Sequence, residues 1–281
     1  MSMKTRRRLS TGIWSFIGIL CFLLLMFPIY WMLCASLMTE PQIFSSPPYL
    51  VPPTPSLNSY TYIFTSDALD VWRLLMNSFI LGGSTMILSV ILSVPAAYAL
   101  SKFPIRGKKL ILLVFLISQM LPSVFNLIPY FYIFKALGVT ETYLAPIIAD
   151  MTMAIPFTVI MLRPFFQSVP SALAEAARID GCNHFQSFLK VMLPICAPGV
   201  AVSLVFSFLF SYSDMIYAKT FLSDTKMWPL TTGIYQTIGR YGIQWSNAMA
   251  FAVVVTIPVL LIFICMQRYI VDGLVAGAVK G

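Results

Sequence analysis

Long runs of apolar residues alternate along this chain with short polar stretches. A helix needs about 20 apolar residues to cross the hydrocarbon core of a bilayer, and six runs reach or approach that length. Backbone groups in lipid must find hydrogen-bond partners within their own segment, so each run is expected to be helical. The strict alternation typical of a membrane β-barrel strand is absent from the sequence. The predicted spans cover about residues 12–38, 74–100, 110–134, 143–166, 195–217 and 248–268.

Composition also indicates a polytopic membrane protein. Hydrophobic residues make up 59% of the 281 residues and charged residues 10%, whereas soluble domains average about 25% charged residues. We therefore predict an all-α integral membrane protein in which residues 1–281 form a single transmembrane domain. The fourth and fifth spans are the least regular, because they are interrupted by Pro146, Pro156, Pro164, Pro194 and Pro198.

Basic residues are distributed unevenly between the two predicted sides of the membrane. With the N-terminus in the cytoplasm, thirteen Lys and Arg residues fall on the cytoplasmic side and five on the outer side. This asymmetry follows the positive-inside rule and places both termini in the cytoplasm. The net charge of +8 therefore reflects orientation and contact with anionic lipid, not nucleic-acid binding. The outer residues are Arg73, Lys135, Lys219, Lys226 and Arg240.

The region after the first span, residues 39–70, differs in composition from the spans. It contains six prolines, which predict an extended, semi-rigid extracytoplasmic loop. Its aromatic residues Tyr49, Tyr60, Tyr62 and Phe64 are expected at the membrane interface. The alternative is that this loop contacts an extracellular partner.

The sequence offers little support for catalysis or metal binding. The five cysteines show no metal-ligand spacing, and His184, the single histidine, lacks the partners of a triad or metal site. The turn Lys102–Lys109 contains Gly107-Lys108, but Lys102 occupies the position of the first glycine of a P-loop. We predict no catalytic residue, no metal and no cofactor bound by this chain.

Four polar residues lie in or at the end of the third and fifth spans. Polar side chains at bilayer depth are tolerated where they face protein or a water-filled cavity. The predicted lining of a translocation path is Gln119, Asn126, Ser213 and Asp214. The alternative is that these residues form interhelical hydrogen bonds that hold the bundle together. Asp150 lies near the outer boundary of the fourth span, and this position does not assign it to either role.

Residues 168–194 are predicted to form two short cytoplasmic helices. Pro170 and Ser171 suggest the start of the first helix, with Ser171 as its cap. Gly181 permits the left-handed turn that ends this helix, and Asn183 with Gln186 predicts a capping box for the second.

The two helices have distinct predicted surfaces. Leu173, Ala176 and Ala177 share one face at helical spacing, where the alanines allow another protein to approach closely. Glu175 and Asp180 offer carboxylates to basic or amide donors of a partner. The second helix is expected to anchor in the membrane core through Phe185, Phe188 and Met192. The alternative is an ordinary solvated loop.

This segment resembles the EAA loop by which ABC-importer permeases dock onto their ATPase. The matching residues are Glu175, Ala176, Ala177, Asp180, Gly181, Leu193 and Pro194. The resemblance extends upstream through Leu121-Pro122, Ile128-Pro129, Leu137-Gly138 and Ile155-Pro156-Phe157, and covers nearly the whole chain. The tail 269–281 is similar to that of the second permease subunit of maltose-type carbohydrate importers at Gly273, Leu274, Gly277, Lys280 and Gly281.

The resemblance implies a six-helix type I importer permease in the bacterial cytoplasmic (inner) membrane. It also implies that a homologous permease completes a heterodimer and that two ABC ATPase subunits bind ATP and magnesium. A solute-binding protein would deliver the sugar, which the resemblance implies to be a di- or oligosaccharide. Residues Leu274–Gly281 would reach into the ATPase dimer. The family usually has Trp-Asn-Glu or Trp-Asn-Asp late in the fifth span, where this chain has Tyr212-Ser213-Asp214.

Three alternatives remain from the sequence. Within the same family, the solute is a glycerol-phosphate-like polyol, which would require cationic residues along the path. A stand-alone secondary carrier would require internal symmetry or several buried carboxylates, and the sequence shows no repeat. A membrane-embedded enzyme would require paired acids or a metal site within the spans.

Overall fold

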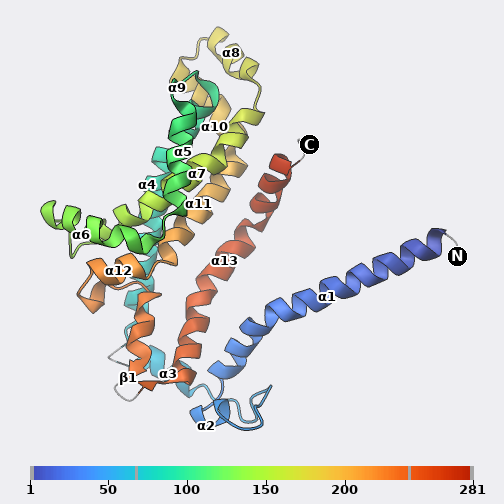
Figure 1. Cartoon of the computed structure of the whole chain (residues 1–281), viewed down its shortest axis with the longest axis vertical. Coiled ribbons are helices and arrows are strands. Elements are labelled where there is room, and N and C mark those ends of the chain that lie inside the picture. The colour runs from blue at the N-terminus through green and yellow to red at the C-terminus, as the bar shows by residue number, and fades with distance from the viewer. Residues whose placement is uncertain (1–2, 67–68, 240–241, 279–281) are drawn as a thin grey trace. The chain divides into compact units, whose positions relative to one another are not determined.

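The computed structural model describes residues 3–66, 69–239 and 242–278 and is predominantly helical (Figure 1). The chain divides into two compact units: Met1–Asp70 with Ile234–Thr256, and Val71–Gly233 with Ile257–Gly281. The long helix α13 (Trp245–Ala278) contributes to both units. The organisation as one domain stays a prediction.

The first unit combines a long N-terminal helix with short elements. Its β1 and β2 strands form an antiparallel pair in which Ile238 lies opposite Ile243. The elements before α13 are α1 (Met3–Ser36), α2 (Glu40–Ile43), α3 (Asn58–Thr65), β1 (Ile238–Gly239) and β2 (Gly242–Ile243).

The second unit is built around a bundle of long helices. Its elements are α4 (Val71–Lys102), α5 (Lys108–Met120), η1 (Ser123–Asn126), α6 (Leu127–Ala136), α7 (Leu144–Ser168), α8 (Ser171–Ile179), α9 (His184–Ser187), the π-turn η2 (Phe188–Met192), α10 (Leu193–Ile195), α11 (Ala197–Tyr212), α12 (Ile216–Phe221) and η3 (Thr225–Met227). The 3-10 segment η4 (Thr232–Thr237) connects this unit to β1.

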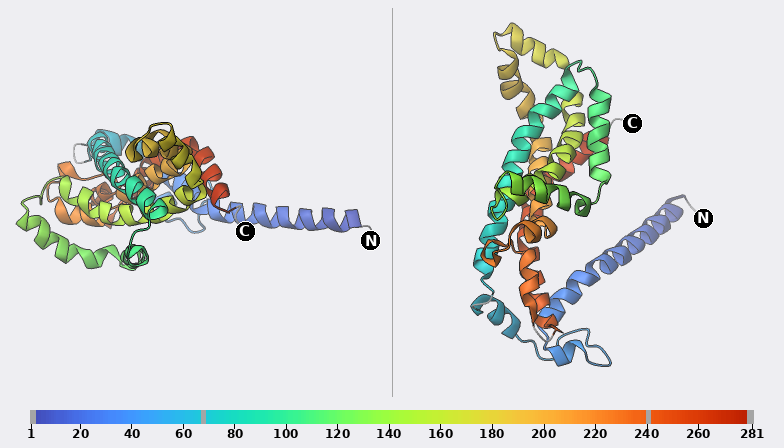
Figure 2. Two further views of the ribbon diagram at one scale, coloured as in Figure 1. Left: turned by 90° about the horizontal axis from the view of Figure 1, so that it is seen from above. Right: turned by 60° about the vertical axis from the view of Figure 1, so that its left-hand side comes forward.

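Helices α4, α7 and α11 pack side by side (Figures 1 and 2). Small residues at these contacts allow the backbones to approach closely, as is usual for membrane helices. The hydroxyl groups of Thr158 and Ser207 are 3.1 Å apart in a buried hydrogen bond between α7 and α11. A Cβ atom added at Gly199 of α11 would lie 2.7 Å from the ring of Phe165, so only glycine fits at this contact.

The spans largely follow the sequence prediction. The described residues contain four long apolar helices, Gly12–Ser36, Val71–Lys102, Leu144–Ser168 and Trp245–Gln267, and two bent helix pairs that bring the total to six if each pair is one span.

The third predicted span, residues 110–134, is not one helix. Lys108–Met120 and Ser123–Ala136 meet at an angle of 102°. The backbone of Leu121 is extended, at φ −80° and ψ 123°, because the ring of Pro122 disfavours helical geometry in the preceding residue. The predicted span at residues 110–134 is thus present as a bent pair of helices, with its break at Leu121–Pro122.

The irregularity expected of the fourth span does not occur, and the fifth span is shorter than predicted. Helix α7 continues through both Pro156 and Pro164. Helix α11 ends at Tyr212 rather than at residue 217, because α12 begins only four residues later in a new direction.

A connection to α4 fixes the segment that follows α12. The side-chain amide of Asn77 donates to the carbonyls of Lys226 and Trp228 at 2.8 and 2.9 Å. Its oxygen accepts a hydrogen bond of 2.8 Å from the Tyr143 hydroxyl. The segment from η3 onward is thus held against the start of α4 and α7, a role for Asn77 that the sequence pattern did not indicate.

Candidate functional site

The expected helix pair is present at one end of the second unit, as α8 and α9 (Figure 1). Gly181 follows the end of α8 and has φ +89°, so the turn after this helix is left-handed, as expected. The capping box of α9 is also confirmed: the Gln186 N–H donates to Asn183 Oδ1 at 2.8 Å, and the Asn183 N–H donates to Gln186 Oε1 at 3.0 Å. Ser171 was expected to cap α8, but Pro170 is the cap residue and its side chain makes no capping bond.

The helix pair attaches to the bundle through a specific set of contacts. Ala177 is buried, and the Ser187 hydroxyl donates to the Ala174 carbonyl at 3.2 Å, joining α9 to α8. Phe188 and Met192 are buried in the same cluster as Tyr98 of α4. Phe185, also expected to anchor the pair, is 66% exposed, and its ring centroid lies 6.4 Å from that of Phe188; its anchoring role stays a prediction.

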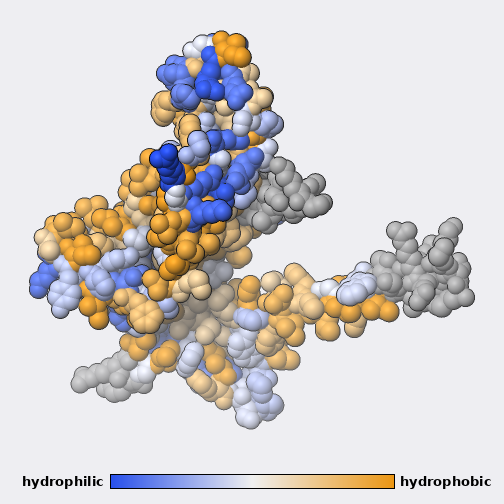
Figure 3. All heavy atoms as spheres, turned by 45° about the horizontal axis from the view of Figure 1, so that its top comes forward, coloured by the Kyte–Doolittle hydropathy of each residue, from blue (hydrophilic) through white to orange (hydrophobic). Residues whose placement is uncertain are grey.

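The outer side of α8 presents apolar side chains between carboxylates. Ile179 is 87% exposed and Leu173 is 43% exposed, and Ala176 is also exposed. Glu175 and Asp180 are exposed beside them. Hydrophilic side chains gather over this end of the unit, above a largely hydrophobic surface (Figure 3). We name six exposed residues of α8 and its C-terminus the docking face: Ala172, Leu173, Glu175, Ala176, Ile179 and Asp180. Ser171 and Arg178 of α8 are also exposed but belong, together with Glu175, to the lining of a cavity toward α4.

The seven residues of the EAA pattern therefore divide between two environments. Glu175, Ala176, Asp180 and Gly181 are exposed, whereas Ala177 is buried and Leu193 is half-buried against the core cluster. Pro194, although exposed, lies within the short α10 beside the bend into α11. Ala177 and Leu193 contribute to the position of the pair, not to its outer surface.

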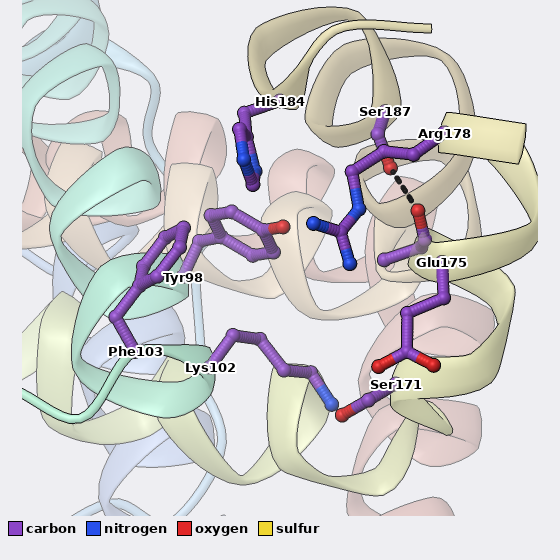
Figure 4. Close-up of a pocket in the computed structure, with 9 residues that line it drawn as sticks. Tyr98, Lys102, Phe103, Ser171, Glu175, Arg178, His184 and Ser187 are labelled. Atoms are coloured by element: carbon purple, nitrogen blue, oxygen red, sulfur yellow. Dashed lines mark hydrogen bonds between the residues drawn. The ribbon is translucent and has the colours of Figure 1, made fainter. Parts of the chain in front are cut away.

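A polar cavity of about 250 Å³ lies between α8 and the end of α4. In Figure 4 the Arg178 guanidinium points toward the Tyr98 hydroxyl, and the Lys102 ammonium lies near Ser171. Lys102 also donates a hydrogen bond to the Val169 carbonyl in the connection that leads into α8. The described lining residues are Tyr98, Lys102, Phe103, Ser171, Ala174, Glu175, Arg178, His184 and Ser187.

This cavity was not predicted as a site. Lys102 was recognised only as part of a basic turn, because its partner on the connection into α8 is 67 positions away. The contact ties the end of α4 to the connection that leads into α8.

A second cavity, of about 350 Å³, lies where α7, α11 and α12 meet. Ser213 and Asp214 line it, together with Asp150, whose side chain is buried; their place on a translocation path stays a prediction. Gln119 and Asn126 are not among its described lining residues. Gln119 instead donates to the Met153 carbonyl at 2.9 Å, an interhelical bond of the kind considered as the alternative. The described lining residues are Ser123, Asp150, Met153, Phe210, Ser213, Asp214, Met215, Ile216 and Tyr217.

Asp214 also has a structural role. Its Oδ1 accepts from the backbone N–H groups of Ile216 and Tyr217 at 3.1 and 3.2 Å, and its Oδ2 accepts from Ala218 at 3.0 Å. A carboxylate at a helix N-terminus satisfies N–H groups that lack helical partners. Asp214 therefore fixes the first turn of α12, which packs through Tyr217 and Phe221 in a cluster with Phe134.

The C-terminal tail is only partly described. Gly273, Leu274 and Gly277 fall within α13, and their predicted contact with an ATPase stays a prediction. Lys280 and Gly281 lie outside the described residues.

Comparison with known families decides the identity of the chain. Residues 89–275 match the family described as binding-protein-dependent transport system inner membrane components. The chain belongs to this family. Members of the family are components of binding-protein-dependent transport systems, which excludes the alternative of a stand-alone carrier, and they are transport components rather than enzymes, which excludes a membrane-embedded enzyme. The prediction of a multi-pass protein of the inner membrane is confirmed.

Two curated permeases illustrate the similarity. The sulfoquinovosyl glycerol transport system permease protein SmoH of Agrobacterium fabrum is 33% identical over 256 residues, which cover 91% of this chain and 89% of SmoH. The trehalose/maltose transport system permease protein MalG of Thermococcus litoralis is 31% identical over 266 residues, which cover 94% of this chain and 95% of MalG.

The fold of this permease is also similar to a solved structure. A chain from a bacterial ABC transporter involved in the import of the acidic polysaccharide alginate superposes with a TM-score of 0.79 at 22% identity. The match covers 96% of this permease and 99% of that chain. The predicted type I importer permease fold is thus confirmed.

Proposed function

We propose that this permease imports a sugar, in particular a di- or oligosaccharide, as one half of a heterodimer with a homologous permease. The observation that carries the proposal is the docking face on α8, held by Gly181 and the capping box in a family whose members are ABC importer components. The MalG relative is named for trehalose and maltose transport, which supports a sugar as the solute.

The docking face has the character of a protein-binding surface. Exposed apolar side chains grouped together and rimmed by polar groups mark interaction sites, and Ile179, Leu173 and Ala176 form such a group on one short helix. The carboxylates of Glu175 and Asp180 at its edge add charge that can select a basic partner. We assign this surface to one of two ABC ATPase subunits, on which ATP and magnesium are bound.

The proposed mechanism is alternating access. Closure of the ATPase subunits on ATP moves α8 and α9, and the bundle follows through Phe188, Met192 and the contact of Lys102 with Val169. A bound partner shifts an equilibrium only by its differential affinity for the two states. The docking face therefore stays engaged in both the inward-open and outward-open states.

The second cavity favours a neutral sugar over a phosphorylated polyol. Its described lining contains the carboxylates of Asp150 and Asp214 and no lysine or arginine. A phosphate group would therefore find no cationic side chain among these lining residues to balance its charge. We infer that a solute-binding protein delivers the sugar to the outer side, where this cavity belongs if both termini are cytoplasmic, as the distribution of basic residues favours.

Co-purification tests the proposal directly. The tagged permease, extracted from its native membrane in mild detergent, is expected to bring with it a second six-helix permease and a P-loop ATPase. Glu175→Lys should lose the ATPase and retain the second permease. Gln167→Lys, at an exposed position near the end of α7, is the control for added positive charge and should retain both.

Recovery of the chain alone or as a homo-oligomer would contradict the assembly. An ATPase that stays bound to the Glu175→Lys and Ile179→Asp variants alike would show that the docking face lies elsewhere. If the complex is recovered, uptake of labelled maltose, trehalose and glycerol phosphate into proteoliposomes separates the sugar from the polyol.

A further inference from the structure

The proline-rich segment between α1 and α3 folds back along α1 as a closed loop. Its base is held by the Ser56 N–H, which donates to the Leu37 carbonyl at 2.9 Å. Halfway along, the Gln42 amide donates to the Thr54 hydroxyl at 2.6 Å. At the tip, the Tyr30 hydroxyl donates to the Leu50 carbonyl at 2.8 Å. These three hydrogen bonds close the loop on itself and turn its tip back toward the transmembrane part of α1.

The position of Tyr30 fixes the depth of the tip. Tyr30 precedes the end of α1 at Ser36 by six residues, or about 9 Å along a helix that rises about 1.5 Å per residue. The apolar part of α1, Gly12–Ser36, has 25 residues and is about 37 Å long, whereas the hydrocarbon core is about 30 Å thick. The α-carbon of Tyr30 therefore lies within the core, and its ring extends toward the interface. A residue bonded to this hydroxyl lies at interfacial depth.

The side chains at the tip suit that depth. Leu50 is 62% exposed, Val51 is 65% exposed and Phe44 is 67% exposed, and the Tyr49 ring beside them is also exposed. The sequence contains no Asp, Glu, Lys or Arg between Pro41 and Ser66. Because soluble partners are steered and selected by charge, an uncharged, apolar tip is better matched to lipid than to a soluble protein.

The backbone of the tip is also suited to a water-poor environment. Each unpaired N–H group taken out of water costs free energy. The tip is flanked on both sides by proline pairs, and proline has no N–H group to leave unpaired. The Leu50 carbonyl has its partner in Tyr30. The flanking prolines are Pro47, Pro48, Pro52 and Pro53.

We propose that residues 44–53 form a membrane anchor, whose tip Tyr49–Val51 inserts into the interfacial layer of the leaflet that surrounds the C-terminal end of α1. The occupant of this apolar surface is lipid. The loop that contains the anchor also contacts the last span, since Glu40 at its start accepts hydrogen bonds from Ser246 near the start of α13. The loop thereby fixes the ends of two spans to one depth in the membrane.

Collision-accessibility measurements with a nitroxide label test the depth. The full permease, with Cys21, Cys34, Cys182, Cys196 and Cys265 replaced, carries one new cysteine at Leu50→Cys and is reconstituted with its co-purifying partners in phosphatidylcholine nanodiscs. The Leu50 side chain is exposed and only its carbonyl is bonded, so the replacement keeps the fold. Asn58→Cys, exposed at the start of α3, is the matched position outside the anchor.

The ratio of oxygen to water-soluble nickel-complex accessibility is expected to be several-fold higher at residue 50 than at residue 58. Adding Tyr30→Phe should bring the ratio at residue 50 toward that at residue 58, because the tip then loses its bond to α1. Equal ratios at both positions would overturn the proposal by placing the tip in water. Protection of residue 50 from both reagents would overturn it by showing that a protein covers the tip.

Discussion

The carboxylate of Glu40 accepts two hydrogen bonds from Ser246, one from its backbone N–H at 2.7 Å and one from its hydroxyl at 2.9 Å. Ser246 is the second residue of α13, where backbone N–H groups have no partner within the helix. A distant carboxylate thus serves the function of an N-cap and also complements the positive end of the helix dipole.

Loss of this carboxylate should destabilise the start of α13. We expect Glu40→Ala to cost about 1–2 kcal/mol, the usual value of a capping interaction. Glu40→Gln, which keeps one oxygen acceptor and loses the charge, should cost less. Thermal unfolding of the purified parent and variant permeases in detergent measures the two losses of stability. A melting temperature of Glu40→Gln below that of Glu40→Ala would contradict this account.

Two adjacent glycines of α4 should respond in opposite directions to the same change. A Cβ atom at Gly82 would lie 2.8 Å from the Phe208 ring, whereas one at Gly83 meets no atom within 4 Å. Gly83→Ala should therefore stabilise the helix by about 0.5–1 kcal/mol, and Gly82→Ala should destabilise the bundle by about 1–3 kcal/mol through overpacking. Thermal unfolding of the two variants provides the comparison. Equal changes in melting temperature would show that Phe208 of α11 moves aside to accommodate the added methyl group.

Asp214 lines the second cavity and caps α12, and two variants separate these roles. Asp214→Asn keeps one of the two oxygens that accept from α12 and loses the other, so it should cost less stability than Asp214→Ala, which should lose about 1 kcal/mol. If the charge itself contacts solute, Asp214→Asn will reduce uptake in proteoliposomes although its melting temperature stays above that of Asp214→Ala. Normal uptake by the stable Asp214→Asn variant would limit Asp214 to its structural role.

Gly181 should tolerate only residues that accept a left-handed backbone. A Cβ atom at this position meets nothing within 4 Å, so the cost of substitution comes from φ +89° alone. We expect Gly181→Val to distort the helix pair, at about 1–2 kcal/mol, and to uncouple ATP hydrolysis from uptake. Gly181→Asn, a residue type that visits this region, is the control and should couple better. The ratio of sugar transported to ATP hydrolysed is the measurement; equal ratios would show that the turn does not control coupling.

Sequence patterns of capping and turn residues predicted the end of α8 and the start of α9. The left-handed turn at Gly181 and the reciprocal hydrogen bonds of Asn183 and Gln186 depend on residues close in sequence, so a short pattern contains the information. The cap of α8 was assigned to Ser171 instead of Pro170, an error of one residue that matches the usual uncertainty of helix ends.

Tertiary packing explains what the sequence could not provide. Pro156 is buried in the middle of α7, and its helix continues; Pro122 is exposed, and its helix breaks. Proline weakens both helices in the same way, and its own exposure does not decide the outcome, because α7 also continues through Pro164, which is exposed; no short sequence pattern distinguishes the two cases. The same applies to Ala176 and Ala177, which are adjacent in the motif, although only Ala177 contacts the bundle.

The segment His184–Ile195 meets α11 at 81°, nearly a right angle. Because this short segment lies nearly perpendicular to the long helix α11, a force applied to the segment acts on α11 as a torque about the helix axis. A segment that continued straight from α11 would transmit the same force as a translation of α11 along its axis, against the neighbouring helices α4 and α7. With the bend, the span can twist in place, and the side chains that face the interior of the bundle are exchanged for others without any change of depth.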